Sequence, residues 1–258
     1  MTQSSRQLAG QGATTLSSFA PDANVAVIGA SGGIGNALCR ALAASASVAT
    51  VHALSRTPGF IDDDVRTHGI NLLDETSIAD ASAAIARSGA LDLVIVATGL
   101  LHEGALQPEK ALREIDGAAM LELLRVNTVG PALIAKHFLP RMRRDGKSVF
   151  AALSARVGSI EDNRLGGWVS YRASKAALNM TIRTLAIEHN RRWPDSVVAT
   201  VHPGTVATPL SQPFRSRTPR AQLFEPEVSA AHLLSVIDGL TPADSGGFFA
   251  WDGTPIEF

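Results

Sequence analysis

Two residues whose side chains can exchange a proton, Tyr171 and Lys175, stand four positions apart in the sequence. A spacing of four places both side chains on one face of a helix, one turn apart. A phenol ordinarily has a pKa of about 10, and a neighbouring ammonium group lowers that value because it stabilises the phenolate. Tyr171 is the only tyrosine in the chain. The pair therefore predicts a proton-transfer site, and the alternative is a chance pairing on a surface helix.

A glycine-rich turn is the second feature that suits a chemical site. The run from Gly29 to Gly35 reads G-A-S-G-G-I-G and stands between a predicted strand and a predicted helix. Glycines allow a ligand to approach the backbone closely, and the first amide groups of a helix bind phosphate oxygens. The run therefore predicts a dinucleotide site rather than a plain turn. The expected contacts are Gly29, Ser31, Gly32, Gly33, Ile34 and Gly35.

The end of the second predicted strand bears on which dinucleotide would bind. A site for NAD usually has Asp or Glu there to bind the ribose hydroxyls, but this chain continues Leu54-Ser55-Arg56. Ser55 and Arg56 would hold a 2′-phosphate, because a guanidinium forms forked, charge-assisted bonds to phosphate. The sequence therefore favours NADP(H) over NAD(H), with a solvated surface arginine as the alternative. After the third predicted strand, Asn71 and Leu72 are placed to border the adenine.

Strands and helices alternate along the chain. The predicted strands are short β-branched runs, as expected for strands buried on both faces of a parallel sheet: 25–28, 48–54, 65–70, 91–96, 149–153, 197–201 and 248–251. The predicted helices are 34–44, 76–87, 118–144, 170–191 and 226–240. This alternation predicts a single-domain, Rossmann-like α/β fold with a doubly wound parallel sheet of about seven strands and helices on both faces. In the 170–191 helix, the expected core-packing stripe is Ala173, Ala177, Met180, Thr184 and Ile187.

The composition is that of an ordinary globular protein. Of 258 residues, 45% are hydrophobic, and the formal net charge is −1, so neither nucleic acid nor an anionic membrane is an expected partner. We expect no membrane span and no metal site, and the single Cys39 suggests a reducing compartment, the cytoplasm. Residues 1–20 are expected to be a disordered or loosely packed tail, residues 21–258 one catalytic domain, and 209–224 a lid.

Together, the Tyr171–Lys175 pair, the glycine turn and the run H-P-G-T-V-A-T at 202–208 resemble a classical short-chain dehydrogenase/reductase over residues 24–254. The runs 153–160 and 251–253 resemble its carbonyl-reductase-like, C-factor-like branch. The resemblance implies hydride transfer between a nicotinamide and a small-molecule carbonyl or secondary alcohol. Tyr171 would donate the proton and Lys175 would bind the nicotinamide ribose. The resemblance also implies a homodimer or homotetramer, and it places four residues beside the nicotinamide: Pro203, Gly204, Val206 and Thr208.

Asn127 is a further candidate on grounds of backbone chemistry. It lies inside the predicted 118–144 helix, where asparagine is locally unfavourable. Pro131, four residues later, has no N–H to donate to the Asn127 carbonyl, which is therefore free to bind a water. The family resemblance assigns this position to a water-mediated proton relay to Lys175. A proline kink without function is the alternative.

Two positions depart from the family pattern. Where the family has a serine that binds the substrate oxygen, this chain has Ala155. Ser154 is our candidate replacement and Ser159 the alternative. Adjacent residues at a strand end point to opposite sides, so the position of Ser154 beside Ala155 does not by itself make it the replacement. The family run Asn-Asn-Ala-Gly is here Val96-Ala97-Thr98-Gly99. We still expect Ala97, Thr98 and Gly99 to contact the cofactor, although the stabilising asparagine is missing.

Two other functions compete with a carbonyl reductase or alcohol dehydrogenase. One is a non-catalytic NADP-binding regulator or structural protein that kept the fold, which Ala155 favours and the Tyr171–Lys175 pair disfavours. The other is the longer branch of the family, which epimerises or dehydrates. The glycine turn fits its G-x-x-G-x-x-G spacing as well as the classical G-x-x-x-G-x-G, but the chain is short for its extra substrate domain. The substrate pocket is expected to include His102, Trp168 and Leu210.

Overall fold

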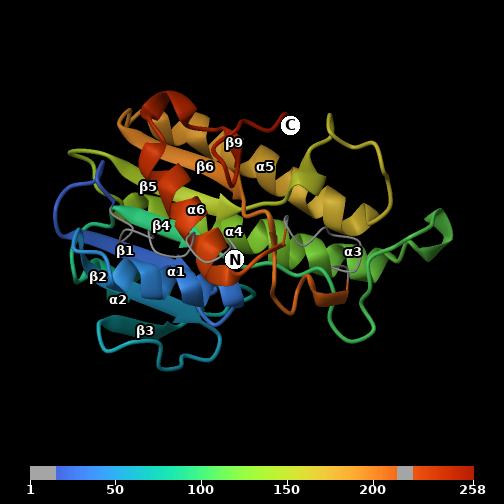
Figure 1. The fold of residues 1–258 in the computed structure, drawn as a ribbon, viewed down its shortest axis with the longest axis horizontal. Coiled ribbons are helices and arrows are strands. Elements are labelled where there is room, and N and C mark those ends of the chain that lie inside the picture. The colour runs from blue at the N-terminus through green and yellow to red at the C-terminus, as the bar shows by residue number, and fades with distance from the viewer. Residues whose placement is uncertain (1–15, 214–222) are drawn as a thin grey trace, which may run out of the picture.

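The computed structural model describes residues 16–213 and 223–258 and shows a central sheet with helices on both faces (Figure 1). Seven parallel strands lie in the order β3-β2-β1-β4-β5-β6-β9. Their bounds are Ala23–Ile28 (β1), Val48–Ser55 (β2), Val65–Gly69 (β3), Leu93–Val96 (β4), Ser148–Leu153 (β5), Ser196–His202 (β6) and Phe248–Ala250 (β9). The predicted fold class is confirmed.

The helices form one layer on each side of this sheet. Their bounds are Gly33–Ala43 (α1), Glu75–Ala86 (α2), Gly117–Leu124 (α3), Gly130–Phe138 (α4), Val169–Asn190 (α5) and Pro226–Gly239 (α6). Val25 and Val27 of β1 share a core with α1 and α6, whereas Ala26 and Ile28 share one with α2, α4 and α5. Because both faces are covered, the central strands are apolar at nearly every position.

The predicted 118–144 helix is not continuous. Between α3 and α4 the chain forms a π-helical turn in which the Gly130 amide donates to the Arg125 carbonyl, five residues back. Pro131 follows in the first turn of α4 and has no N–H for the regular bond to Asn127. The proline thus accounts for the break, and single π-turns inside helices frequently occur at functional sites.

The stretch Gly117–Arg141 also corrects the expectation that no segment could span a membrane. By length and composition it is apolar enough to do so. This is weak evidence, because core helices of soluble proteins pass the same test, and Ile134, Ala135 and Phe138 of this stretch are buried in the core.

The outer face of α5 differs from the sequence prediction. Met180 is 66% exposed and Ile187 is 55% exposed, so the predicted core-packing stripe was wrong. The residues that α5 contributes to the core are Leu178, Ile182 and Ala186.

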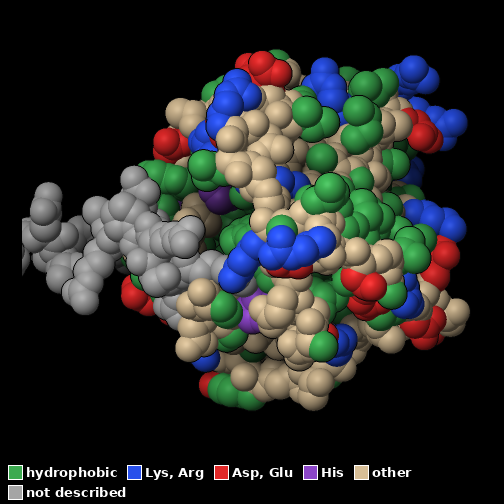
Figure 2. Space-filling view, turned by 90° about the vertical axis from the view of Figure 1, so that its right-hand side faces the viewer, with side chains coloured by type: hydrophobic (Ala, Val, Ile, Leu, Met, Phe, Trp, Pro, Cys, Tyr) green, Lys and Arg blue, Asp and Glu red, His purple; other side chains and the backbone are tan. Residues whose placement is uncertain are grey.

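Figure 2 views the end of the molecule where α3 begins, and exposed hydrophobic side chains lie there among charged ones.

Residues 16–20, the end of the predicted tail, pack against the body of the protein. Leu16 and Phe19 are buried in the core on the α6 side, and the Ser18 amide donates to Asp238 at 2.9 Å. Residues 1–15 lie outside the described residues. Residues 214–222 of the predicted lid also lie outside the described residues. The last two residues of the predicted lid form the short strand β8 (Leu223–Phe224), which pairs with β7 (Thr205–Val206).

Candidate active site

The glycine turn lies at the carboxyl end of β1, where the order of the strands reverses between β1 and β4. Ligands of open α/β sheets bind at such a switch point. Gly29 has a φ of 92°, and a side chain on Gly35 would place its Cβ 2.2 Å from the Gly29 carbonyl oxygen. A Cβ on Gly33 would lie 2.8 Å from the Thr208 methyl carbon. The turn therefore requires glycine, and it packs against the predicted nicotinamide segment.

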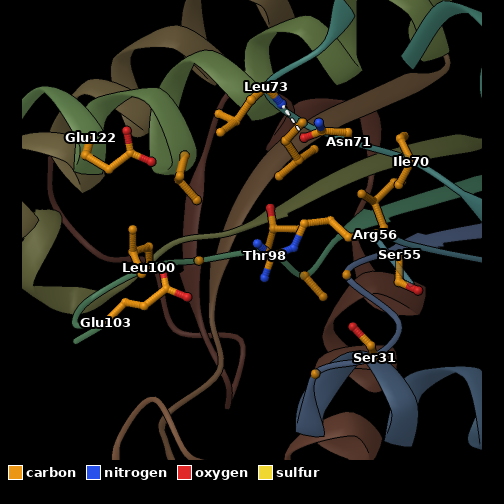
Figure 3. Close-up of a pocket in the computed structure, with 17 residues that line it drawn as sticks. Ser31, Ser55, Arg56, Ile70, Asn71, Leu73, Thr98, Leu100, Glu103 and Glu122 are labelled. Atoms are coloured by element: carbon orange, nitrogen blue, oxygen red, sulfur yellow. Dashed lines mark hydrogen bonds between the residues drawn. The ribbon is translucent and has the colours of Figure 1, made fainter. Parts of the chain in front are cut away.

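A cavity of about 290 Å³ runs along the switch point (Figure 3). Figure 3 shows the Arg56 side chain reaching into it from the end of β2. Its lining includes ten of the predicted cofactor contacts: Gly29, Ser31, Gly32, Ser55, Arg56, Asn71, Leu72, Ala97, Thr98 and Gly99. Glu103 and Glu122, to which sequence reasoning gave no role, also line it.

The polar groups in this cavity are not equally free to bind a ligand. The Ser55 hydroxyl donates to the Thr57 carbonyl at 2.9 Å, and the Asn71 side-chain oxygen accepts from the Leu73 amide at 3.1 Å. The Thr98 hydroxyl oxygen is buried and has no hydrogen-bond partner among the described residues. Arg56 is exposed. An orphaned hydroxyl, a glycine cradle and a cationic side chain suit a phosphorylated dinucleotide.

Tyr171 and Lys175 lie on the buried face of α5, in its first two turns, and are 7% and 3% exposed. The Lys175 ammonium donates to the Leu153 carbonyl at 2.9 Å and lies 6.0 Å from the centre of the Tyr171 ring. Burial lowers the pKa of Lys175 to about 8. Burial also raises the pKa of Tyr171, so the protein's own residues do not give the lowering that the sequence led us to expect.

Gly158 explains how Lys175 comes so close to the end of β5. A Cβ at this position would lie 2.7 Å from the Lys175 Cβ and 2.8 Å from its carbonyl carbon. Only a glycine leaves room for α5 to pack directly against the loop after β5. The identity of residue 158 therefore helps to set the place of the lysine.

Asn127 contacts α5 through its side chain. Its amide oxygen accepts from the Leu100 amide at 2.8 Å, and its amide nitrogen donates to the Leu100 carbonyl at 2.8 Å and to Ser174 at 3.0 Å. A Cβ on Gly99 would lie 3.7 Å from the Lys175 ammonium and 3.8 Å from the Asn127 side-chain oxygen. The structure thus brings Asn127 and Lys175 to the same point of the cleft.

A second cavity, of about 350 Å³, holds most of the remaining predicted residues. Its lining includes Ile34, Ser154, Trp168, Tyr171, Pro203, Gly204, Val206, Thr208 and Leu210. Gly204 has a φ of 78°, and a Cβ there would lie 2.7 Å from the Phe224 ring. His102 does not line the cavity, but its ring nitrogen lies 3.1 Å from the Leu210 carbonyl.

The two candidate serines have different surroundings. The Ser154 hydroxyl is buried without a hydrogen-bond partner among the described residues, and Ser154 lines the second cavity with Ala155. The Ser159 hydroxyl accepts from the Asp162 amide at 3.0 Å, and Ser159 is not part of the cavity wall. The geometry therefore favours Ser154.

Sequence reasoning did not single out His202 as a residue of the candidate site. It lines the second cavity, and its Nδ1 is buried without a hydrogen-bond partner among the described residues. Burial lowers its pKa to about 4, so the ring is neutral near pH 7. The only sequence signal was its place directly before Pro203. Within 16–213 and 223–258, no group of three or more His, Cys, Asp or Glu side chains is arranged to hold a metal ion.

Comparison with known proteins complements this geometry. Residues 23–219 match the family model described as short chain dehydrogenase. The chain is 36% identical over 148 residues to C-signal of Myxococcus xanthus, which covers 57% of this chain and 84% of that protein. It is 32% identical over 194 residues to 1-hydroxy-2-glutathionyl-2-methyl-3-butene dehydrogenase of Rhodococcus sp. (strain AD45), covering 74% of this chain and 79% of that one. NADPH-bound carbonyl reductase from chicken fatty liver has the same fold, with a TM-score of 0.80 at 22% identity over 97% of this chain and 100% of that one.

Proposed function

The chain belongs to the short-chain dehydrogenase family and is an oxidoreductase acting on CH–OH or C=O groups, and from that premise we propose that it is an NADP-dependent reductase of small carbonyl compounds. One observation carries the proposal. Tyr171 lines one cavity with Ser154, whose hydroxyl has no partner in the described part of the chain, beside Lys175 and the glycine turn. An acid and a hydrogen-bond donor are thus available to one carbonyl oxygen.

The chain's own residues supply the proton and hold the oxygen. Tyr171 donates its phenolic proton to the substrate oxygen, and its raised pKa keeps the phenol protonated at neutral pH until that step. The Ser154 hydroxyl donates a hydrogen bond to the same oxygen as negative charge develops on it. Bound NADPH would supply the hydride to the carbonyl carbon.

Lys175 and Asn127 support the tyrosine. With a pKa of about 8, Lys175 is mostly an ammonium at pH 7, so it would face the phenolate that remains after Tyr171 has given up its proton, and it can hold ribose hydroxyls. Asn127 is fixed by its side-chain bonds to Leu100 and Ser174. Its backbone carbonyl, opposite Pro131, would hold the water that passes a proton to Lys175.

The proposed reaction is tested with purified protein, NADPH and a panel of aldehydes, ketones and diketones. Tyr171→Phe should lower kcat by about 10²–10⁴-fold while NADPH still binds, because only the proton donor is lost. Thr184→Val is a matched control, since it removes an exposed hydroxyl of the same helix that donates to Met180 at 2.9 Å.

Two results would contradict the proposal. Full activity of Tyr171→Phe would remove the tyrosine from the mechanism. Tight NADPH binding by the wild type without turnover of any carbonyl would instead favour a non-catalytic NADP-binding regulator or structural protein. Ala155 in the cavity wall, where the family has a serine, supports that alternative.

Our proposal that the protein prefers NADP over NAD depends on Arg56. It reaches into the cofactor cavity from the end of β2, where no carboxylate follows the strand. Arg56→Ala should weaken NADPH binding roughly tenfold or more and leave NADH binding nearly unchanged, because only NADPH carries the 2′-phosphate. Isothermal titration with both cofactors measures this, with Arg87→Ala as a distant control. Equal losses for NADPH and NADH would contradict the assignment.

We also propose that the protein works in the cytoplasm as a homodimer or homotetramer. Exposed apolar side chains on α5 support the oligomer, because Met180 and Ile187 would be covered by a second copy. The single cysteine, Cys39, cannot form a disulfide within the chain, which favours a reducing compartment.

A further inference from the structure

The chain reaches the catalytic helix α5 through three consecutive residues in the left-handed region. Gly166, Gly167 and Trp168 have φ angles of 63°, 68° and 53°. Glycine adopts this conformation freely, but for a bulky residue such as tryptophan it costs free energy. Such strain persists only where the surrounding structure holds it. Trp168 is also the residue that caps α5, and its side chain makes no capping bond.

Glu109 holds this strained turn from a distant loop. Its backbone carbonyl accepts from the Trp168 amide at 2.6 Å. Its carboxylate accepts from the Ser170 amide at 3.3 Å and from the Ser170 hydroxyl. Glu109 is 5% exposed and Ser170 is fully buried. A buried carboxylate is tolerated only with such partners, and its charge is well placed beside the positive end of the helix dipole.

Arg172 holds the same turn from the helix side. Its guanidinium donates to the Gly167 carbonyl at 2.9 Å, the Gly166 carbonyl at 3.1 Å and the Val157 carbonyl at 3.3 Å. The turn is therefore fixed at both of its ends. Of the two anchors, only Glu109 binds the first turn of α5 from outside the helix.

The start of α5 and its capping residue carry two side chains that line the second cavity. Tyr171 follows Ser170 directly, and the Trp168 ring meets the Tyr171 ring edge to face, with centroids 6.3 Å apart. Both rings line the second cavity, whereas Glu109 does not. Any rotation of the first turn would move the phenol and the indole together.

We propose that Glu109 is a positioning residue, whose buried carboxylate fixes the first turn of α5 so that Tyr171 and Trp168 keep their places in the substrate cavity. This inference rests on the proposed reductase function for its kinetic consequences. The geometric part concerns this chain's own residues and can be measured without turnover.

The test compares Glu109→Ala and Glu109→Gln with Glu114→Gln. Glu114 is a matched control, because it is an exposed carboxylate on the same segment that accepts from the Lys110 amide at 2.8 Å. Each variant is labelled with 5-fluorotryptophan, and the Trp168 resonance is assigned among the three tryptophans with Trp168→Phe. Steady-state kinetics with small and bulky ketones are measured on the same folded samples.

We expect Glu109→Ala to shift or broaden the Trp168 resonance and to lower kcat about tenfold or more, as small misplacements of reacting groups do. The KM for bulky ketones should rise more than the KM for small ones, because the indole wall moves. Glu109→Gln keeps one acceptor oxygen and should fall between Glu109→Ala and the wild type. Glu114→Gln should match the wild type in every readout.

A purely structural cap predicts a different result. Glu109→Ala would then lower the melting temperature while the Trp168 resonance, kcat and the KM ratio stay as in the wild type, and the proposal would be overturned. If the wild type reduces no carbonyl compound, the reductase proposal fails, and the Trp168 resonance alone still decides the role of Glu109.

Discussion

Ser154 and Ser159 stand five residues apart, yet they offer different chemistry. The Ser159 hydroxyl is occupied by the Asp162 amide, whereas the Ser154 hydroxyl is buried and unpartnered among the described residues. A buried polar group without a partner costs free energy, so it usually has a ligand, a water or a catalytic task. At Ser154 the neighbouring cavity and Tyr171 point to a catalytic task.

Replacing each serine separates these roles. Ser154→Ala should lower kcat by about 10²–10³-fold with little change in stability, because it removes a donor to the developing oxyanion. Ser159→Ala should leave kcat unchanged and cost about 1 kcal/mol of stability through the lost bond to the Asp162 amide. Steady-state kinetics and thermal unfolding of both variants measure the contrast. The assignment fails if Ser159→Ala loses the activity and Ser154→Ala keeps it.

At the scale of elements, the sequence predicted the strands and helices well, but not every face or break. Glycine spacing and β-branched runs depend on local backbone chemistry, so the turn at Gly29–Gly35 and the strands were readable. The inward face of α5 could not be predicted in this way, because the helix buries Tyr171, Lys175 and Asn179 and leaves Met180 in solvent. The spacing of its apolar residues therefore predicts the exposed face as the buried one. Pro131 indicated that one helical hydrogen bond would be missing, but it did not indicate that the chain would form a π-helical turn there.

Contacts between distant parts of the chain set the limit of prediction for the whole molecule. Glu109 and Ser170 are 61 residues apart, and nothing in the local sequence of either one indicates the bond. The sequence likewise does not indicate that the Ser154 hydroxyl has no partner within residues 16–213 and 223–258, since this depends on which groups fail to reach it. The family motifs gave the residues near the reaction, and the fold was needed to find what holds them.

We expect a histidine pair at the sheet edge, His52 and His68, to make the stability of the whole molecule depend on pH. The Nδ1 atom of His52 on β2 lies 2.9 Å from the Nε2 atom of His68 on β3. The Nε2 atom of His52 lies 2.9 Å from the Ser88 hydroxyl oxygen. Burial, then the nearby His68 and Arg66, lowers the pKa of His52 from 6.5 to about 4. Unfolding restores the ordinary value, so between these two pH values the unfolded chain binds more protons than the folded one.

The free energy of unfolding should therefore fall as the pH drops from 6.5 to about 4, by roughly 1–3 kcal/mol from His52. His52→Gln should flatten the profile over that interval, since the glutamine does not titrate. Urea unfolding of both proteins at several pH values measures the two slopes, and His202 contributes equally to both. Parallel slopes would show that this pair does not govern the acid response.

The fit of Gly158 against Lys175 bears on how this enzyme could change its substrate range. A methyl group at position 158 would collide with the backbone and side chain of the lysine, whereas Ala155, three residues earlier, lines the second cavity, the proposed place of the substrate. Evolution can therefore enlarge or polarise the wall at 155 while the ammonium stays where it is. The loop after β5 thus has one residue that can change, Ala155, and one that must stay glycine because it packs against Lys175.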